Sequence, residues 1–190
     1  MTTKELNFDV FLHLSQYLDI DDLMSLKQVS KHSSEAVDYY LSRMRHLLIG
    51  SSVKNYIDWC RQKNMRLEDQ LRSTIHIKGE GYESQIIDSL KSLSNNCKNI
   101  SSVTLFECRI HWPLIQHFER FEKLNNWTVV DISMSPWTDK NDSQKIKELL
   151  GRKIQVLTMN FIRHYPTVEL TAIMKCFDFK TIPEYDWMFY

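Results

Sequence analysis

Cysteine and histidine are the residues of this chain whose chemistry could support a reaction or a metal site. Cys108 follows Glu107 and stands three positions before His111. A thiol nucleophile needs a base about 3 Å away and a pair of donors for the oxyanion, and one Cys with one His supplies neither. His111 and His117 are six positions apart, whereas two zinc ligands on one helical face are four apart. We therefore expect no catalytic residue, no metal site and no cofactor, and we predict that the protein is not an enzyme.

A nucleotide-binding loop is not indicated either. The chain contains no G-x-x-x-x-G-K-[ST], G-x-G-x-x-G or H-E-x-x-H motif, and it has only four glycines from which to build a phosphate-binding loop. Its four cysteines are far apart and form no C-x-x-C pair. This spacing predicts reduced thiols packed in the interior rather than a disulfide framework.

The charges of the chain balance, with 24 Lys and Arg against 24 Asp and Glu. Binding to nucleic acid or to an anionic membrane usually requires a basic face, so we expect neither kind of partner. Apolar segments such as 47–49 and the mostly apolar 128–132 are far shorter than the ~18–20 residues that span a bilayer. The N-terminus shows no signal-like apolar core. These features predict a cytoplasmic or nuclear protein that recognises another protein by shape.

The length of 190 residues fits one domain, or a small module joined to a modest second one. Apolar residues recur at steps of three and four over 5–48, which predicts three helices. Asp21 or Asp22 is expected to cap the second helix, and the third is expected to run to about Ile49 and end at Gly50. A further helical stretch over 52–71 has the pattern of a connector.

Beyond this connector, short β-type segments alternate with amphipathic helical ones. The apolar pairs of these segments are separated by 28, 27 and 27 residues, a period typical of solenoid proteins. Such units bury their apolar sides only by stacking, so we expect an arc with parallel strands inside and helices outside. The aromatic tail over 183–190 is expected to cap the last unit or to bind a partner. The aligned pairs are Ile75/Ile77, Val103/Leu105, Val130/Ile132 and Leu157/Met159.

Side chains alternate along a strand, so the positions between the core residues should form the open inner wall of the arc. This wall is expected to be polar with Phe106 and Val129 as hydrophobic anchors, and to contact a target protein. The predicted target-binding residues are His76, Lys78, Thr104, Phe106, Val129, Asp131, Thr158 and Asn160.

The N-terminal segment resembles an F-box, a module that begins Leu-Pro, has a first helix ending in Tyr-Leu, continues Asp-x-x-Asp-Leu and closes with Val-Ser or Val-Cys. The matching positions here are Leu6, Tyr17-Leu18, Asp22-Leu23 and Val29-Ser30. The chain departs from the family pattern at Asn7, where proline is usual, and at Ser33, where tryptophan is usual.

The second half resembles leucine-rich repeats of the kind often fused behind an F-box, whose apolar frame is L-x-x-L-x-L-x-x-C/N. The segment from Ile100 to Cys108 fits this frame fully, and the segment from Trp127 to Ser135 fits it loosely. The expected fold is therefore an α/β repeat protein, a three-helix F-box followed by a short, degenerate leucine-rich-repeat arc. Its expected divisions are 1–50 for the F-box, 51–71 for the connector and 72–190 for the repeats.

The resemblance implies a function without bond chemistry. An F-box docks on the Skp-type adaptor of a cullin ubiquitin ligase (SCF), and the repeats capture the protein to be ubiquitylated. The alternative is an F-box-like or repeat scaffold that binds proteins without serving a ligase, which the departures at Asn7 and Ser33 leave open. The identity of the target is not encoded in any pattern found here. The expected adaptor-binding residues are Leu6, Asn7, Val10, Leu14, Leu18, Leu23, Leu26 and Val29.

Overall fold

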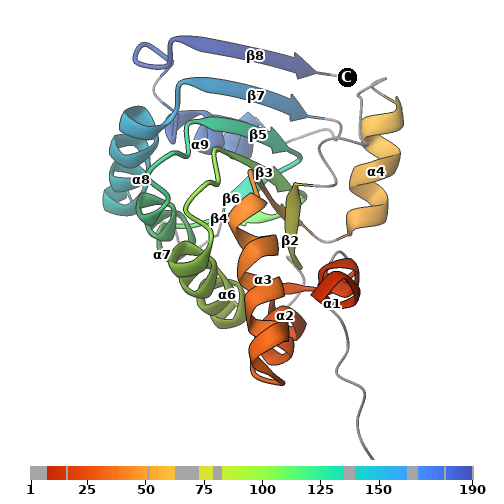
Figure 1. Cartoon of the computed structure of the whole chain (residues 1–190). Coiled ribbons are helices and arrows are strands. Elements are labelled where there is room, and N and C mark those ends of the chain that lie inside the picture. Colours follow the sequence, from red (N-terminus) through yellow and green to blue (C-terminus); the bar gives the residue numbers. More distant parts are fainter. Residues whose placement is uncertain are drawn as a thin grey trace, which may run out of the picture.

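The chain folds into an α/β structure built on a six-stranded, fully parallel sheet (Figure 1). This computed structural model describes residues 8–15, 17–50, 52–62, 73–78, 83–134, 140–161, 167–177 and 179–189. In spatial order the strands are β2 (Thr74–Lys78), β1 (His46–Gly50), β3 (Ser102–Phe106), β5 (Asn126–Val130), β7 (Val156–Phe161) and β8 (Glu184–Phe189).

Helices cover one face of this sheet, and one helix lies on the other. The covering layer consists of α3 (Lys31–Arg43), α6 (Glu83–Asn96), α7 (Trp112–Ile115) with the 3₁₀ helix η1 (Gln116–Arg120), α8 (Lys140–Lys153) and α9 (Thr167–Lys175). Helix α4 (Val53–Gln62) lies on the opposite face. Helices α1 (Phe8–Ser15) and α2 (Ile20–Lys27) pack against α3 at one end of the molecule.

The placement of α4 follows from the strand order. The chain passes from β1 to β2 in one direction along the sheet and from β2 back past β1 to β3 in the other. Connections between parallel strands are right-handed, so connections that run in opposite directions must cross opposite faces of the sheet. The α4 connection therefore lies on the face that α6 leaves uncovered.

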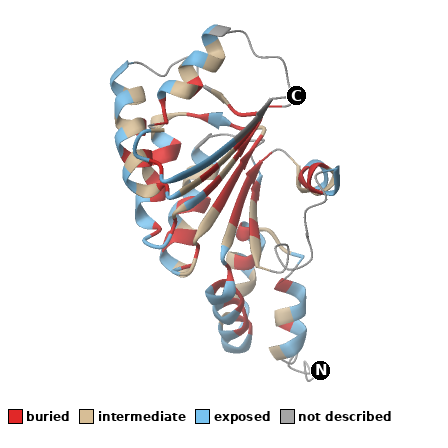
Figure 2. Cartoon of the chain, turned by 90° about the horizontal axis from the view of Figure 1, so that it is seen from above, coloured by how far each residue is buried: buried red, intermediate tan, exposed pale blue. Residues whose placement is uncertain are grey.

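A single large hydrophobic core lies between the sheet and the helix layer. Figure 2 shows the buried residues in red along the strands and on the inner sides of the helices. The core includes Leu23 of α2 and Leu41 of α3 together with Leu47 of β1 and Val103 of β3. The N-terminal helices and the sheet are thus packed through one continuous interior.

Several predicted elements are confirmed. Strands occur at β2, β3 and β7, and helices occur at α6, α8 and α9, close to the predicted segments. The predicted connector helix is present as α4, and its predicted continuation over 63–71 lies outside the described residues. Ser30 caps α3 with a reciprocal hydrogen bond from the Ser30 backbone N–H to the Ser33 hydroxyl.

Other predictions were wrong at the junction of the N-terminal helices with the sheet. The third helix ends at Arg43, and 46–50 form strand β1 in the interior of the sheet instead of the last turn of that helix. The predicted boundary at position 50 would make the N-terminal helices a separate unit, but the described part of this segment contributes β1 to the sheet and shares its core. The cap of α2 is Asp19, whose side chain accepts the N–H of Asp22 at 3.0 Å. At the other end of the sheet the aromatic tail forms β8, which pairs with β7 and covers the strand of the last unit, in agreement with the predicted cap.

The predicted alignment was also wrong in one unit. Strand pairing aligns Val103 with Trp127 and Trp127 with Leu157, so the core pair of β5 is Trp127 and Val129 rather than Val130 and Ile132. The separations from Ile75 through these residues are 28, 24 and 30. Because side chains alternate along a strand, the error of three positions assigned the side chains of β5 to the wrong faces.

Gly50 provides a test of the close contact between β1 and β3. A Cβ atom at position 50 would lie 2.7 Å from the carbonyl oxygen of Phe106, which is closer than van der Waals contact permits. We expect Gly50→Ala to lower the free energy of unfolding by about 1–3 kcal/mol, as measured by urea denaturation, because the backbone of β3 must shift. Asn126→Ala, at an exposed strand position, should stay within about 0.5 kcal/mol of the parent. Equal stabilities of all three proteins would contradict the tight packing.

Candidate functional site

Exposed apolar side chains gather on the N-terminal helices. In the part of the chain that the structure describes, seven large hydrophobic residues are exposed, and five of them lie between positions 10 and 39. Isolated exposed apolar residues are ordinary, but a concentration on one small element marks an interaction surface. We call these five residues the apolar surface; they are Val10, Leu14, Tyr17, Val29 and Tyr39.

Helix α1 has a buried side and an exposed side. Phe11 and Ser15 are buried, and the Ser15 hydroxyl donates to the carbonyl oxygen of Phe11 at 2.8 Å. Val10 and Leu14 are exposed four positions apart, and Tyr17 follows three positions later with 72% of its surface exposed. Asp9 and His13 are exposed beside them, so the exposed side of α1 combines an apolar strip with polar neighbours.

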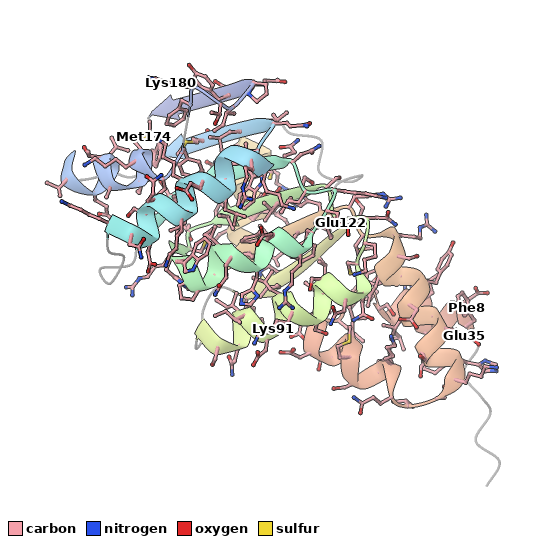
Figure 3. The ribbon with its side chains drawn as sticks, turned by 90° about the vertical axis from the view of Figure 1, so that its left-hand side faces the viewer. Phe8, Glu35, Lys91, Glu122, Met174 and Lys180 are labelled. Atoms are coloured by element: carbon pink, nitrogen blue, oxygen red, sulfur yellow. The ribbon has the colours of Figure 1, made fainter. Side chains whose placement is uncertain are left out.

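Tyr39 of α3 is in contact with α1. The Tyr39 ring meets the ring of Phe8 edge to face with centroids 5.9 Å apart. The Arg43 guanidinium lies 5.4 Å from the ring centroid of Tyr39 and donates to its hydroxyl at 3.0 Å. Figure 3 shows Phe8 and Glu35 at the end of the molecule opposite Met174 and Lys180. The apolar surface thus lies at one end of the structure.

The predicted adaptor-binding residues separate into three groups. Val10, Leu14 and Val29 are exposed, as a docking role requires. Leu18 and Leu26 are half-buried against the main core, and Leu23 is fully buried in it. The prediction was therefore wrong for Leu23, which holds α2 against the interior. Leu6 and Asn7 lie outside the described residues. Tyr17 and Tyr39, which are also exposed, were not among the predicted residues, although Tyr17 continues the spacing of Val10 and Leu14.

A second candidate surface, the sheet face opposite the helix layer, is partly closed by α4. Leu48, Phe106 and Val130 on this face form a second buried cluster with Tyr56, Trp59 and Cys60 of α4. The Phe106 ring lies 5.7 Å from the Tyr56 ring and 6.2 Å from the Trp59 ring, both edge to face. Side chains of α4 therefore cover this sheet face at Leu48, Phe106 and Val130 of the central strands.

This packing changes the assignment of the predicted target-binding residues. His76 and Thr158 are half-buried and Lys78 is exposed, so these three remain accessible. The prediction that the other five face an open wall was wrong. Phe106 is covered by α4, and Val129 points into the main core. The buried five are Thr104, Phe106, Val129, Asp131 and Asn160.

Beside α4, the sheet face carries a hydrogen-bonded imidazole. His46 Nδ1 lies 2.7 Å from the Ser102 hydroxyl, and its Nε2 lies 3.1 Å from the Thr104 hydroxyl. Tyr56 of α4 in turn forms a hydrogen bond with Thr104. Burial lowers the pKa of His46 to about 4, because the charged imidazolium loses its hydration there. The imidazole is consequently neutral at physiological pH and serves as a link between two strands.

The low pKa of His46 predicts a loss of stability in acid. The folded state binds the His46 proton only near pH 4, whereas the unfolded state binds it near 6.5, so stability is complete above pH 6.5 and falls as the pH decreases towards 4. We expect His46 to contribute a loss of about 2 kcal/mol between pH 7.5 and pH 5, measured by urea denaturation. His46→Gln should remove this contribution, whereas His32→Gln, at an exposed position, should keep it. An unchanged pH dependence in His46→Gln would refute the assignment.

The cysteines, together with His111, occupy structural positions. All four cysteines are buried thiols outside any disulfide, and burial raises the pKa of the Cys108 thiol to about 12. His111 caps α7, and its Nδ1 accepts the N–H of Leu114 at 3.2 Å. Within the described ranges, no three His, Cys, Asp or Glu side chains lie close enough to hold a metal ion.

Comparison of the chain with protein-family models and with curated protein sequences yields no match. Over the described part of the chain, no helix is both long and apolar enough to cross a membrane. The functional assignment therefore depends on the surfaces described above.

Proposed function

We propose that this protein is the substrate-recognition subunit of an SCF-type ubiquitin ligase. In this proposal α1–α3 bind a Skp-type adaptor, and the strand–helix units bind the protein to be ubiquitylated. The observation that carries the proposal is the apolar surface on α1–α3, which lies in the same segment that resembles an F-box.

The apolar surface has the composition expected of a protein interface. Aromatic and aliphatic side chains supply binding energy when a partner excludes water from them, and Tyr is enriched at such interfaces. Exposed groups of both signs surround these residues, including Asp9 on α1 and Lys31 on α3. Charged groups of both signs around the apolar surface suit a protein partner, whereas nucleic acid would require a continuous basic patch.

The strand–helix units support the leucine-rich-repeat part of the proposal. Once the alignment of β5 is corrected, Leu124, Trp127, Val129 and Ile132 are all buried and follow the same spacing as the segment from Ile100 to Cys108. The backbone also repeats: Glu107 and Asp131 follow β3 and β5 at equivalent positions, with φ angles of 49° and 46°. These angles belong to the left-handed region, which few residues other than glycine adopt.

Target recognition is proposed to use the part of the sheet face that α4 leaves accessible. Thr128 and Thr158 pair in register across β5 and β7, and both are partly accessible. Glu184 and Asp186 extend the same face on the edge strand β8 and are exposed. The surface offered to a target is therefore polar, with hydroxyl groups in its middle and carboxylates at one side.

Recruitment of this kind accelerates ubiquitin transfer without a catalytic group in the recruiting chain. Holding an acceptor lysine near a charged conjugating enzyme raises its effective concentration by orders of magnitude. The alternative, a scaffold that binds proteins without serving a ligase, uses the same surfaces. Adaptor binding distinguishes the two proposals.

The apolar surface provides the direct test. We expect the double variant Val10→Asp/Leu14→Asp to weaken binding of a purified Skp-type adaptor at least tenfold, measured by calorimetry, because two desolvated carboxylates would enter the interface. Since both side chains are exposed, the fold should persist, which circular dichroism and thermal denaturation will check. Leu23→Asp is unsuitable for this test because it buries a charge in the core and should unfold the chain.

A matched control is available at the other end of the molecule. Val168 of α9 is 84% exposed, so Val168→Asp makes the same kind of substitution once, adding one negative charge at an apolar position distant from the apolar surface. This variant should bind the adaptor as tightly as the parent. Absence of adaptor binding by the parent would favour the scaffold, and equal affinities of parent and double variant would place the adaptor site elsewhere.

A further inference from the structure

A small pocket lies where the N-terminal helices meet the edge of the sheet. It has a volume of about 230 Å³ and opens between the start of α2, the edge strand β2 and the first turns of α6. Pockets for drug-sized ligands occupy about 300–1,000 Å³, so this one suits a group the size of a single amino acid. Its lining residues are Asp19, Ile20, Asp21, His76, Ile77, Lys78, Gln85, Ile86 and Ser89.

Hydrogen-bond acceptors gather on one part of the lining. Asp19 and Asp21 contribute carboxylates, and the bond from the Asp22 N–H occupies only Oδ1 of Asp19. His76 Nε2 lies 3.1 Å from the carbonyl oxygen of Gly50, and since a carbonyl only accepts, Nε2 carries the ring proton. In the neutral ring Nδ1 is then an acceptor. Burial is the main cause that lowers the pKa of His76, which favours this neutral form.

A cation and an apolar floor complete the pocket. Lys78 is the only Lys or Arg among the lining residues, and it follows His76 by two positions on β2. Ile20 and Ile77 are almost fully buried, and Ile86 packs against the main core beside them. The lining therefore presents acceptors for a cationic donor, the Lys78 ammonium with the Gln85 amide and the Ser89 hydroxyl as donors for an oxygen atom, and a small aliphatic surface at Ile86.

We propose that this pocket binds an α-ammonium group together with the adjacent carboxylate or carbonyl oxygen and an apolar side chain. The ammonium has three donors and a positive charge, which match the two carboxylates and the imidazole. Lys78 pairs with the neighbouring oxygen, and the apolar side chain of the ligand contacts Ile86, the isoleucine of the lining that keeps an accessible surface. Two ligands share this chemistry: a free apolar amino acid and the first residue of a polypeptide with a free N-terminus. The site does not require the adaptor role proposed above.

Titration of the full chain with small probes tests the proposal. Chemical shifts and calorimetry are recorded with leucine, leucinamide, the peptide Leu-Ala-Ala amide and N-acetyl-leucine. We expect binding by at least one of the first three and at least tenfold weaker binding by N-acetyl-leucine, which lacks the ammonium. Tighter binding of leucine than of the peptide identifies a free amino acid as the ligand. Tighter or equal binding of the peptide identifies a polypeptide N-terminus. Equal binding of N-acetyl-leucine, or no binding of any probe at 10 mM, a limit of about −2.7 kcal/mol, would overturn the proposal.

Substitutions in the lining locate the binding. Asp19→Asn with Asp21→Asn should weaken binding at least tenfold, and the amide at position 19 can still accept the helix-capping hydrogen bond. Lys78→Gln should weaken the binding of leucine more than the binding of leucinamide, because only leucine carries a negatively charged carboxylate. Glu148→Gln, which removes an exposed carboxylate on α8, should leave the affinity unchanged. If the Asp19/Asp21 variant binds the probes as tightly as the parent and has the same Tm, the assignment of the binding to this pocket is refuted. These measurements use no adaptor. A negative result would therefore refute the pocket proposal alone, whatever the adaptor-binding test of Val10→Asp/Leu14→Asp shows.

Discussion

The right-handedness of connections between parallel strands is the constraint on which the rest of this molecule depends. The strand order reverses after β2, so the connection through α4 crosses one face of the sheet and the connection through α6 crosses the other. The reversal has two effects. Phe106 and Val130 are buried under α4, and β2 becomes an edge strand next to α2. Both the accessible part of the sheet face and the pocket beside Asp19 follow from this topology.

Shared packing links the proposed partner-binding regions. Leu23 and Leu41 of the N-terminal helices belong to the same core as Leu47 and Val103 of the sheet. Side chains in a close-packed interior transmit displacements rather than absorb them. The apolar surface and the accessible sheet face are therefore held in one rigid relation. In the proposed ligase subunit, this rigidity fixes the distance between the adaptor and a bound target, on which recruitment by proximity depends.

Much of the element order can be predicted from this sequence, because strands such as 102–106 alternate apolar and polar residues while α6 and α8 show helical spacing. Strand β1 was missed because its apolar residues, Leu47, Leu48 and Ile49, are consecutive, and a short apolar run buried on both faces has no diagnostic period. The face assignment of β5 failed for a related reason: Trp127 to Val130 is apolar on both faces except at Thr128, so the pattern does not select the register. The burial of the target-binding residues could not be predicted, since it depends on which face α4 crosses. The spacing of Val10 and Leu14 predicts an amphipathic helix at α1, but which of its apolar residues are exposed follows only from how α1 packs against α3.

Strand β1 also limits how this chain can evolve. It lies between β2 and β3, yet it follows directly after α3 in the sequence. Consider recombination that replaces the N-terminal segment with that of another protein. A junction after position 50 would replace β1 as well and so insert a foreign strand into the sheet. A junction before position 46 would keep β1 but bring in helices that have not evolved to pack on this core. Gene shuffling, which readily exchanges autonomous modules, is thus disfavoured for this architecture. New specificities would have to arise through gradual replacement of surface side chains, with the interior inherited as a whole.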